Sequence, residues 1–118
     1  MPFKNILKRL VDATPQTIGA IVIDWEGEAV QEFCRCDPYE IRFAAAHQGI
    51  ILSRLKEIHG SGQRGAVEEV TLTTSTCHLV IGCINKEYAL AMHIGRNGSL
   101  GVALRHFRQA IRELEKEI

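Results

Sequence analysis

Apolar residues recur at helical spacing near both ends of the chain. Near the start they form one stripe of a predicted helix over residues 3–11, and its members are Phe3, Ile6, Leu7, Leu10 and Val11. The Thr14-Pro15 step ends this helix, because a residue that precedes proline is pushed out of helical backbone angles. Near the other end, Ser99 is suited to cap a second amphipathic helix. Its apolar stripe comprises Leu100, Ala103, Leu104, Phe107, Ala110, Ile111 and Leu114.

Between these helices lie five runs with the composition of β-strands. Two of them, residues 17–25 and 77–84, are apolar on both faces, which is typical of central strands. The other three are residues 28–34, 66–74 and 88–94. Tight turns at Glu26-Gly27 and over residues 85–87 join neighbouring runs into hairpins. The run over 28–34 is short and more polar, so we expect it at an edge of the sheet, where unpaired backbone groups invite a partner.

A longer helix is predicted between the second and third strands, over residues 39–59. Asp37 is placed to cap it, and Pro38 suits the first helical position. We expect its core-facing stripe to consist of Ile41, Ala44, Gln48, Ile51, Leu52, Leu55 and Ile58. The order is therefore helix, two strands, helix, three strands, helix. This order predicts one domain over residues 1–118, an α/β sandwich around a five-stranded antiparallel sheet.

The long helix has a second surface that its own sheet does not explain. Apolar side chains lie opposite the core stripe, namely Phe43, Ala46 and Ile50. A line of small residues runs between the two faces and consists of Ala45, Gly49 and Ser53. One interpretation is a helix buried within its own monomer, and the other is a helix that contacts both its own sheet and another chain. A chain of 118 residues has little material to cover both sides of one helix, which favours the second.

Composition and charge argue against several classes of function. The chain has 14 basic and 14 acidic residues and a formal net charge of zero, unlike a dedicated nucleic-acid binder or an electrostatic membrane binder. No run approaches the roughly 20 apolar residues that span a bilayer. The N-terminal residues mix charged with apolar side chains, unlike a secretory signal. We therefore expect a cytoplasmic protein without membrane or nucleic-acid partners, whose four cysteines are thiols.

Motifs for cofactor or metal chemistry are weak. The glycines of Gly95-x-x-Gly98-x-x-Gly101 match neither nucleotide-binding loop, so we interpret them as a turn before a capped helix. Besides the Cys34-x-Cys36 pair, Cys77 and Cys83 lie at opposite ends of one strand, roughly 20 Å apart and too far for one zinc ion. We expect no metal, no cofactor and no disulfide within the monomer.

Other polar residues carry little functional signal. His78 and His93 come close across a hairpin only in one register. The arginines of the last helix, Arg105, Arg108 and Arg112, are followed closely by glutamates and are interpreted as a solvated face with local ion pairs. Neither set has the nucleophile, base and orienting acid that covalent catalysis requires. We therefore predict no catalytic residue.

Three segments together resemble a Roadblock (dynein light chain) domain, in the style of its bacterial, MglB-like members. They are the hairpin over residues 19–27, the small-residue helix from Phe43 to Leu55, and the passage from Asn97-Gly98-Ser99-Leu100-Gly101 to Arg112-Glu113-Leu114. The resemblance covers nearly the whole chain, residues 6–114. It rests on patterns of fold, and none of the three segments is a catalytic signature.

The resemblance implies sheet order 2-1-5-4-3, with the long helix on one face and the terminal helices on the other. It implies a homodimer in which the second strands pair edge to edge and the long helices pack side by side. It also implies a partner, a small Ras-like GTPase that docks on the dimer. Such a module regulates the GTPase, as activator or exchange factor, by reshaping the GTPase's own switch residues, or it serves only as a scaffold. The expected dimer or partner interface comprises Phe43, Ala45, Ala46, Gly49, Ile50, Ser53, Ala29, Gln31 and Phe33.

Two other functions stay open at this stage. A small-molecule sensor would show a closed pocket between sheet and helix. A thiol or metal enzyme would show a cysteine or histidine with a shifted pKa in a cleft.

Overall fold

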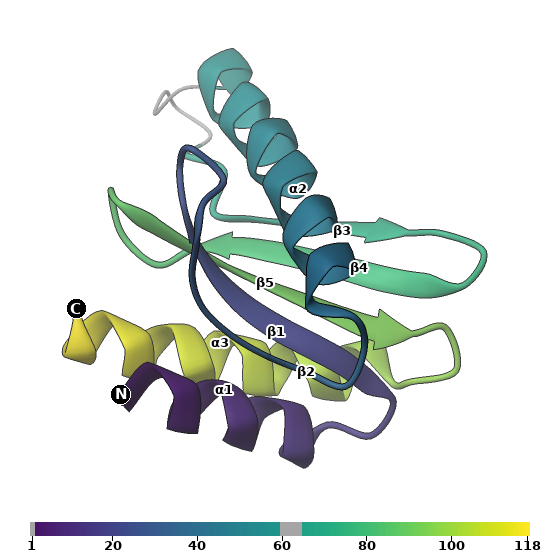
Figure 1. The fold of residues 1–118 in the computed structure, drawn as a ribbon. Helices are drawn as coiled ribbons and strands as arrows, with labels where there is room; N and C mark the ends of the chain where they lie inside the picture. The colour runs from purple at the N-terminus through teal and green to yellow at the C-terminus, as the bar shows by residue number, and fades with distance from the viewer. Residues whose placement is uncertain (1, 60–64) are drawn as a thin grey trace.

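A single sheet lies between helices in the computed structural model, which describes residues 2–59 and 65–118 (Figure 1). Its elements are α1 (Pro2–Ala13), β1 (Thr17–Asp24), β2 (Ala29–Cys34), α2 (Pro38–His59), β3 (Glu69–Thr73), β4 (Cys77–Cys83), β5 (Tyr88–Gly95) and α3 (Leu100–Glu117). The strands pair antiparallel in the order β2-β1-β5-β4-β3. Both the predicted element order and the sheet order that the resemblance implied are confirmed. None of the helices in the described ranges is long and apolar enough to cross a membrane.

The two faces of the sheet are covered unequally. Helices α1 and α3 lie side by side against one face, whereas α2 alone crosses the other (Figure 1). Because side chains alternate along a strand, Ala20 and Val22 of β1 face the helix pair while Ile21 and Ile23 face α2. Strand β1 therefore buries both faces, as its apolar composition predicted, whereas Leu79 of β4 is only half-buried on the α2 face.

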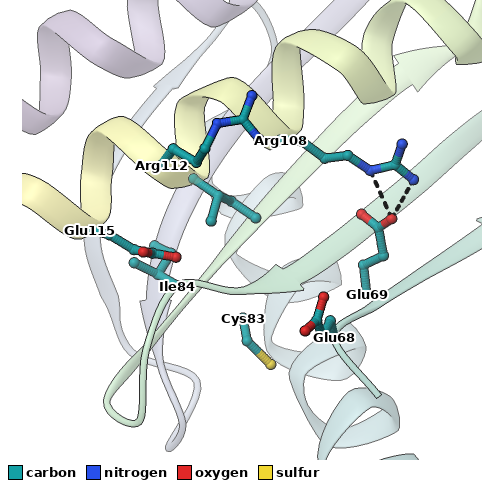
Figure 2. Close-up of a pocket in the computed structure, with 8 residues that line it drawn as sticks. Glu68, Glu69, Cys83, Ile84, Arg108, Arg112 and Glu115 are labelled. Carbon is teal, nitrogen blue, oxygen red and sulfur yellow. Dashed lines mark hydrogen bonds and ion pairs between the residues drawn. The ribbon is translucent and has the colours of Figure 1, made fainter. Parts of the chain in front are cut away.

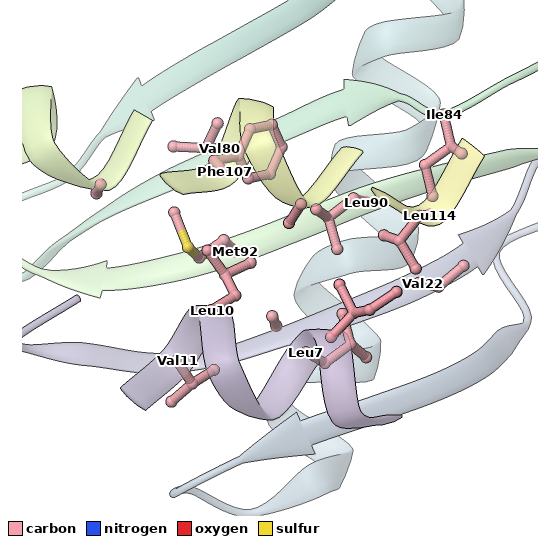
Figure 3. Packing of buried hydrophobic residues seen from close by; sticks show 14 of the residues in the cluster. Leu7, Leu10, Val11, Val22, Val80, Ile84, Leu90, Met92, Phe107 and Leu114 are labelled. Carbon is pink, nitrogen blue, oxygen red and sulfur yellow. The ribbon is translucent and has the colours of Figure 1, made fainter. Parts of the chain in front are cut away.

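The larger core lies under the helix pair (Figure 3). Leu7 and Val11 of α1 and Phe107 and Leu114 of α3 are completely buried there. They pack with fully buried residues of the central strands, which are Ala20, Val22, Val80, Leu90, Met92 and Ile94. Burial of side chains of this size stabilises a fold by about 1.5–3 kcal/mol each. The amphipathic stripes of both terminal helices are thus the basis of this core.

Side-chain caps fix where the elements begin. The Asp37 carboxylate accepts a hydrogen bond from the N–H of Tyr39 at 3.0 Å, and the Ser99 hydroxyl accepts one from Val102 at 3.4 Å. Between β1 and β2, the Asp24 carboxylate accepts the N–H groups of two residues of the following turn at 2.9 and 3.0 Å. That turn needs Gly27, whose φ is +89°. Both predicted caps are therefore present.

The core-facing side of α2 differs in part from the expected one. Ile41, Gln48 and Leu52 are buried as expected. Ile51 and Ile58, also expected in the core, are 38% and 75% exposed. The buried line of α2 runs through Ile41, Ala45, Gln48 and Leu52, at steps of four, three and four, so these residues lie on one side of the helix. Ile51 and Ile58 fall outside this line.

The small residues of α2 correct a second expectation. Ala45 and Gly49 were assigned to a surface open to a partner, but both are buried against the sheet. A Cβ atom at position 49 would lie 3.1 Å from Cδ1 of Ile23 on β1. Small side chains at these positions let α2 approach its own sheet closely, so within the single chain they pack against the sheet and leave little exposed surface.

Two glycine substitutions should affect stability in opposite ways. A Cβ atom at Gly19 would lie 2.5 Å from Cβ and 3.0 Å from Cα of Cys34, on the paired strand β2. We expect Gly19→Ala to lower the free energy of unfolding by about 1–3 kcal/mol, as overpacking does. The matched control is Gly101→Ala in α3, where no atom lies within 4 Å of the new Cβ and stability should be unchanged or up to about 1 kcal/mol higher. Urea unfolding of both variants decides, and equal stability would contradict the tight β1–β2 contact.

Candidate interaction surface around helix α2

The outer side of α2 presents aromatic and aliphatic side chains to solvent. Tyr39, Phe43 and Ile50 are 69%, 57% and 57% exposed. The rings of Tyr39 and Phe43 stack with centroids 6.1 Å apart, and the ring of His47 lies 4.5 Å beyond Phe43. Nδ1 of His47 donates a hydrogen bond to the Phe43 carbonyl at 2.9 Å, which holds the imidazole in place. Phe43 and Ile50 are therefore exposed, as expected, in an ordered apolar row.

The flank of α2 that faces β2 is polar and already has partners. Arg42 forms an ion pair with Glu32 of β2, with Nε donating to Oε2 at 2.8 Å. Further along, the Lys56 ammonium lies 4.6 Å from the centre of the Trp25 ring. Ala46 adjoins the turn at Gly27, where an added Cβ would approach it to 3.2 Å. This flank therefore leaves little apolar surface unused.

The flank of α2 that faces β3 is apolar and open. Ala44, Ile51 and Ile58 follow one another at seven-residue steps, which is two helical turns, so they lie along one line. Ala44 adjoins Leu79 of β4 in a surface groove, which places the whole line on the β3 side of the helix. The exposed isoleucines thus lie on the side of α2 where the sheet is uncovered.

The sheet itself is uncovered beside this flank. In β3 and β4, the pairs Val70–Ile81 and Leu72–Leu79 share the face on which α2 lies. Only Ile81 is buried, and the other three are half-buried. Five strands span about 19 Å, whereas one helix with its side chains is about 10–12 Å wide. We call this surface the open face and define it as Ile51, Ile58, Val70, Leu72 and Leu79.

At the N-terminal half of α2 the open face deepens into a groove of about 490 Å³. Its apolar wall comes from Ile41 and Ala44 of α2 and Leu79 of β4. Residues 74–76 of the β3–β4 turn and His93 of β5 also line the groove. This groove and three other surface hollows in the described part of the chain open to solvent.

A buried polar pair lies beneath α2 at this groove. Nε2 of His93 and Oε1 of Gln48 are 2.8 Å apart, and because that oxygen can only accept, Nε2 carries the proton. Burial lowers the pKa of His93 from 6.5 to about 4, so the ring is neutral at pH 7. The Gln48 amide nitrogen finds no hydrogen-bond partner among the described residues. Sequence reasoning missed this pair, although each is a polar residue within an apolar run.

The cysteines are poorly suited to nucleophilic chemistry. All four are free thiols. Burial, and then the neighbouring Cys34, raises the pKa of Cys36 to about 11, which keeps that thiol protonated. His78 and His93 lie on opposite faces of the sheet, because β4 and β5 pair His78 with Ile94 and Leu79 with His93. Within residues 2–59 and 65–118, no three acidic, histidine or cysteine side chains converge as metal ligands.

A second groove, of about 400 Å³, lies between α3 and the ends of β3 and β4 (Figure 2). Figure 2 shows Arg108 of α3 directed at Glu69 of β3, and its Nε donates to Oε1 at 2.9 Å. Arg112 donates to Gln109 within α3 at 2.8 Å. Glu68 and Glu115 line the same groove, so acidic groups offset the guanidinium charges. The expected local ion pairing is confirmed for Arg108.

The expected residues of β2 lie at the opposite edge of the sheet from β3. Ala29 is exposed, and Gln31 and Phe33 are half-buried. The Phe33 side chain packs against the core under α1 and α3, so it is occupied within the monomer. Of the residues expected on α2, Ala46 and Ser53 are half-buried on the flank toward β2. The structure therefore brings Phe43 and Ile50 together but not with the β2 residues.

Comparison with solved structures shows the fold. A Roadblock/LC7 domain from Streptomyces avermitilis superposes with a TM-score of 0.85 at 19% identity, covering 97% of this chain and 95% of that one. Myxococcus xanthus MglB gives 0.86 at 12% identity, with 98% and 94% covered. Acanthamoeba castellanii profilin IA gives 0.59 at 12% identity, with 98% of each chain covered. No protein-family model matches the sequence, and no curated protein matches it. The chain thus has the Roadblock/LC7 fold. The match to profilin IA shows that a related fold also occurs in a protein of another name.

The His93–Gln48 pair predicts a pH dependence of stability. The pKa of His93 is about 4 in the folded protein, below its ordinary 6.5, so only the unfolded chain binds this proton between those values. Its contribution is complete above pH 6.5 and is lost as the pH falls toward 4, by about 3 kcal/mol in total. Urea unfolding from pH 7 to 4 should show a shallower decline for His93→Asn than for wild type. The control His106→Asn, on α3, should keep the wild-type slope, and parallel curves for all three would contradict burial of a neutral His93.

Neighbouring positions on α2 should respond oppositely to the same substitution. Gly49 is packed against Ile23, so Gly49→Arg should abolish folding. Ile50 projects into solvent, so Ile50→Arg should keep wild-type circular dichroism and lose less than about 0.5 kcal/mol of stability. A folded Gly49→Arg variant would show that α2 is rotated from the orientation described.

Proposed function

We propose that the chain is a homodimeric, cytoplasmic Roadblock-type module that binds a small Ras-like GTPase and regulates or scaffolds it. The observation that carries the proposal is the open face, where apolar residues of α2, β3 and β4 lack a covering element in the described structure. The module is not itself catalytic in this proposal. It acts on the GTPase as an activator, an exchange factor or a scaffold.

A second copy of α2 is the natural cover for the open face. On the other side of the sheet two helices are needed to bury the same five strands. A partner chain that placed its own α2 beside the first would supply the missing helix and bury both sets of exposed isoleucines. Removal of such side chains from water stabilises by about 25 cal/mol per Å² of apolar surface. Zero net charge leaves no strong repulsion between copies.

The position of the open face favours β3 as the edge strand next to the dimer axis. The resemblance implied pairing through β2, but the flank of α2 on that side is closed by the Arg42–Glu32 ion pair. On the β3 side, the exposed Ile51 and Ile58 continue into the half-buried Val70 and Leu72. We therefore propose α2 and β3 as the dimer interface and treat pairing through β2, with Ala29, Gln31 and Phe33, as the competing arrangement.

The GTPase is assigned to the outer row of α2. Tyr39, Phe43 and Ile50 point away from the sheet, so a dimer formed along the β3 flank would leave them accessible. Aromatic side chains held by stacking are typical anchors of protein interfaces. The likeness of fold to MglB supports a role of this class. No nucleotide-binding loop accompanies it in the sequence, so the GTP chemistry would belong to the partner.

Oligomeric state tests the dimer and its edge together. Light scattering coupled to size exclusion should give wild type about twice the 13.2 kDa of one chain. Ile51→Glu should be folded and monomeric, because it places a carboxylate in the apolar contact. The matched control is Val30→Glu on β2, a similarly exposed apolar residue that should leave the dimer intact. Loss of the dimer in the control alone would assign the interface to β2, and a monomeric wild type would refute the homodimer.

Binding and turnover test the GTPase. Purified Ras-like GTPases from the source organism, loaded with GDP or a GTP analogue, should include one that wild type binds. Phe43→Glu should weaken that binding roughly tenfold or more and remain dimeric. Arg105→Glu on the far side, in α3, is the control and should bind normally. The rates of GTP hydrolysis and nucleotide release with and without the chain then separate activator, exchange factor and scaffold, and intrinsic GTP hydrolysis by the chain alone would contradict the proposal.

A further inference from the structure

We propose that in the homodimer Ile58 of each protomer occupies the groove beside Ala44 of the other, with the two copies of Ile51 meeting at the symmetry axis. This inference rests on the proposed function, because it assumes that the α2 flanks face one another. It goes further by fixing the register of the two helices and by committing the groove to a second copy of this chain.

The three residues form a self-complementary line. Ala44 is small, half-buried and set in the wall of a groove of about 490 Å³. Ile51, two turns further along, is 38% exposed. Ile58, two turns beyond that, is 75% exposed and has no cover among the described residues. The groove at Ala44 and the protruding side chain of Ile58 thus lie on opposite sides of Ile51, each about 10 Å from it along the helix.

Symmetry makes this arrangement pair with itself. Both protomers must cover the same face of a shared sheet, so the two-fold axis is normal to that face and the α2 helices run antiparallel. In such a symmetric contact, a residue that follows the axis position in one helix faces the residue that precedes it by the same number of positions in the partner helix. With the axis at Ile51, Ile58 maps onto the partner subunit's Ala44, and the protruding side chain meets the hollow.

Other registers match poorly. An axis at Ile50 would place Ile58 opposite the partner subunit's Arg42, whose guanidinium is held by Glu32. An axis at Arg54 would set Ile58 against the partner subunit's Ile50, two protruding side chains on one contact. An axis at Ile50 would also set Lys56, whose ammonium lies over the Trp25 ring, opposite the partner subunit's Ala44. The register centred on Ile51 is therefore the one of these three that joins a large apolar residue to a small one.

The chemistry of the groove suits an aliphatic occupant. Its walls near Ala44 are the side chains of Ile41 and Leu79. The titratable groups that line it are Glu40, Cys36, Cys77 and His93, and no lysine or arginine is among the lining residues. His93 is engaged by Gln48, and Cys77 lies 3.4 Å from the Thr74 hydroxyl. The hydrogen-bonding capacity facing the groove is thus partly satisfied within the monomer, which lowers the cost of covering it with an isoleucine.

An exchange of the large and small residues tests the register. Ala44→Ile fills the groove and Ile58→Ala removes its occupant, so each single variant should weaken dimerisation roughly tenfold or more. The double variant Ala44→Ile with Ile58→Ala moves the large side chain to the other partner and should return to within about threefold of wild type, a non-additivity expected only for residues in contact. Sedimentation equilibrium gives the dissociation constants, with circular dichroism to confirm folding.

The control pairs Ala44→Ile with Ile50→Ala, which alters an equally apolar residue on the outer row and should show no recovery. Additive losses in the Ala44/Ile58 pair, from a wild type that is dimeric, would overturn the register and leave the dimer standing. A monomeric wild type would instead refute the proposed function beneath it.

Cysteine cross-linking covers the case in which Ala44→Ile fails to fold. Ile51→Cys should form a disulfide-linked dimer on mild oxidation, because its two copies meet at the axis. Arg54→Cys is the control, since its copies would be offset by about 9 Å along antiparallel helices, beyond the usual reach of a disulfide. Wild type, with its four native thiols, sets the background. Cross-linking of Arg54→Cys in preference to Ile51→Cys would overturn the register.

Discussion

One helix is too narrow to cover a five-stranded sheet, and this difference in width determines which surfaces of the protein are buried and which are exposed. On one side α1 and α3 together bury the strands and leave their polar faces to water. On the other side α2 lies alone and packs mainly against β1, β2, β4 and β5. Val70, Leu72 and Leu79 are then only half-buried, and Ile51 and Ile58 on one flank of α2 are exposed. The narrow cover explains why Ile51 and Ile58 are exposed beside a part of the sheet that stays half-buried.

The contact between α2 and the sheet combines large and small apolar side chains. Gly49 of the helix faces Ile23 of β1, and Ala45 shares a buried cluster with Ala89 and Ala91 of β5. Apolar packing is not directional by itself. The hydrogen bond between Gln48 and His93 adds a directional contact between α2 and β5. A buried polar pair thus reinforces the placement of α2 that the apolar residues already favour.

Much of the fold could be predicted from the sequence, and the reasons for the exceptions are physical. Helical spacing and capping residues such as Asp37 and Ser99 are local signals, so the elements and their order followed from them. Strand order is a long-range property, and only the resemblance supplied it. The orientation of α2 was predicted wrongly in part because hydrophobicity ranks Ile51 and Ile58 above Ala45 and Gly49. The structure reverses that ranking, because the close approach of α2 to the sheet at Ala45 and Gly49 leaves room only for small side chains. The His93–Gln48 pair was missed because its partners are 45 residues apart.

The placement of the chain ends gives the molecule two distinct sides. Helix α1, which begins the described chain, and α3, which ends it, lie together on the face away from α2 (Figure 1). A two-fold axis normal to the sheet would keep all four ends of a dimer on that same side. Any polypeptide joined to either end, or any surface to which an end is tethered, would therefore hold the α2 side outward. The proposed dimer would thus carry its chain ends on one side of the sheet and its α2 helices on the other.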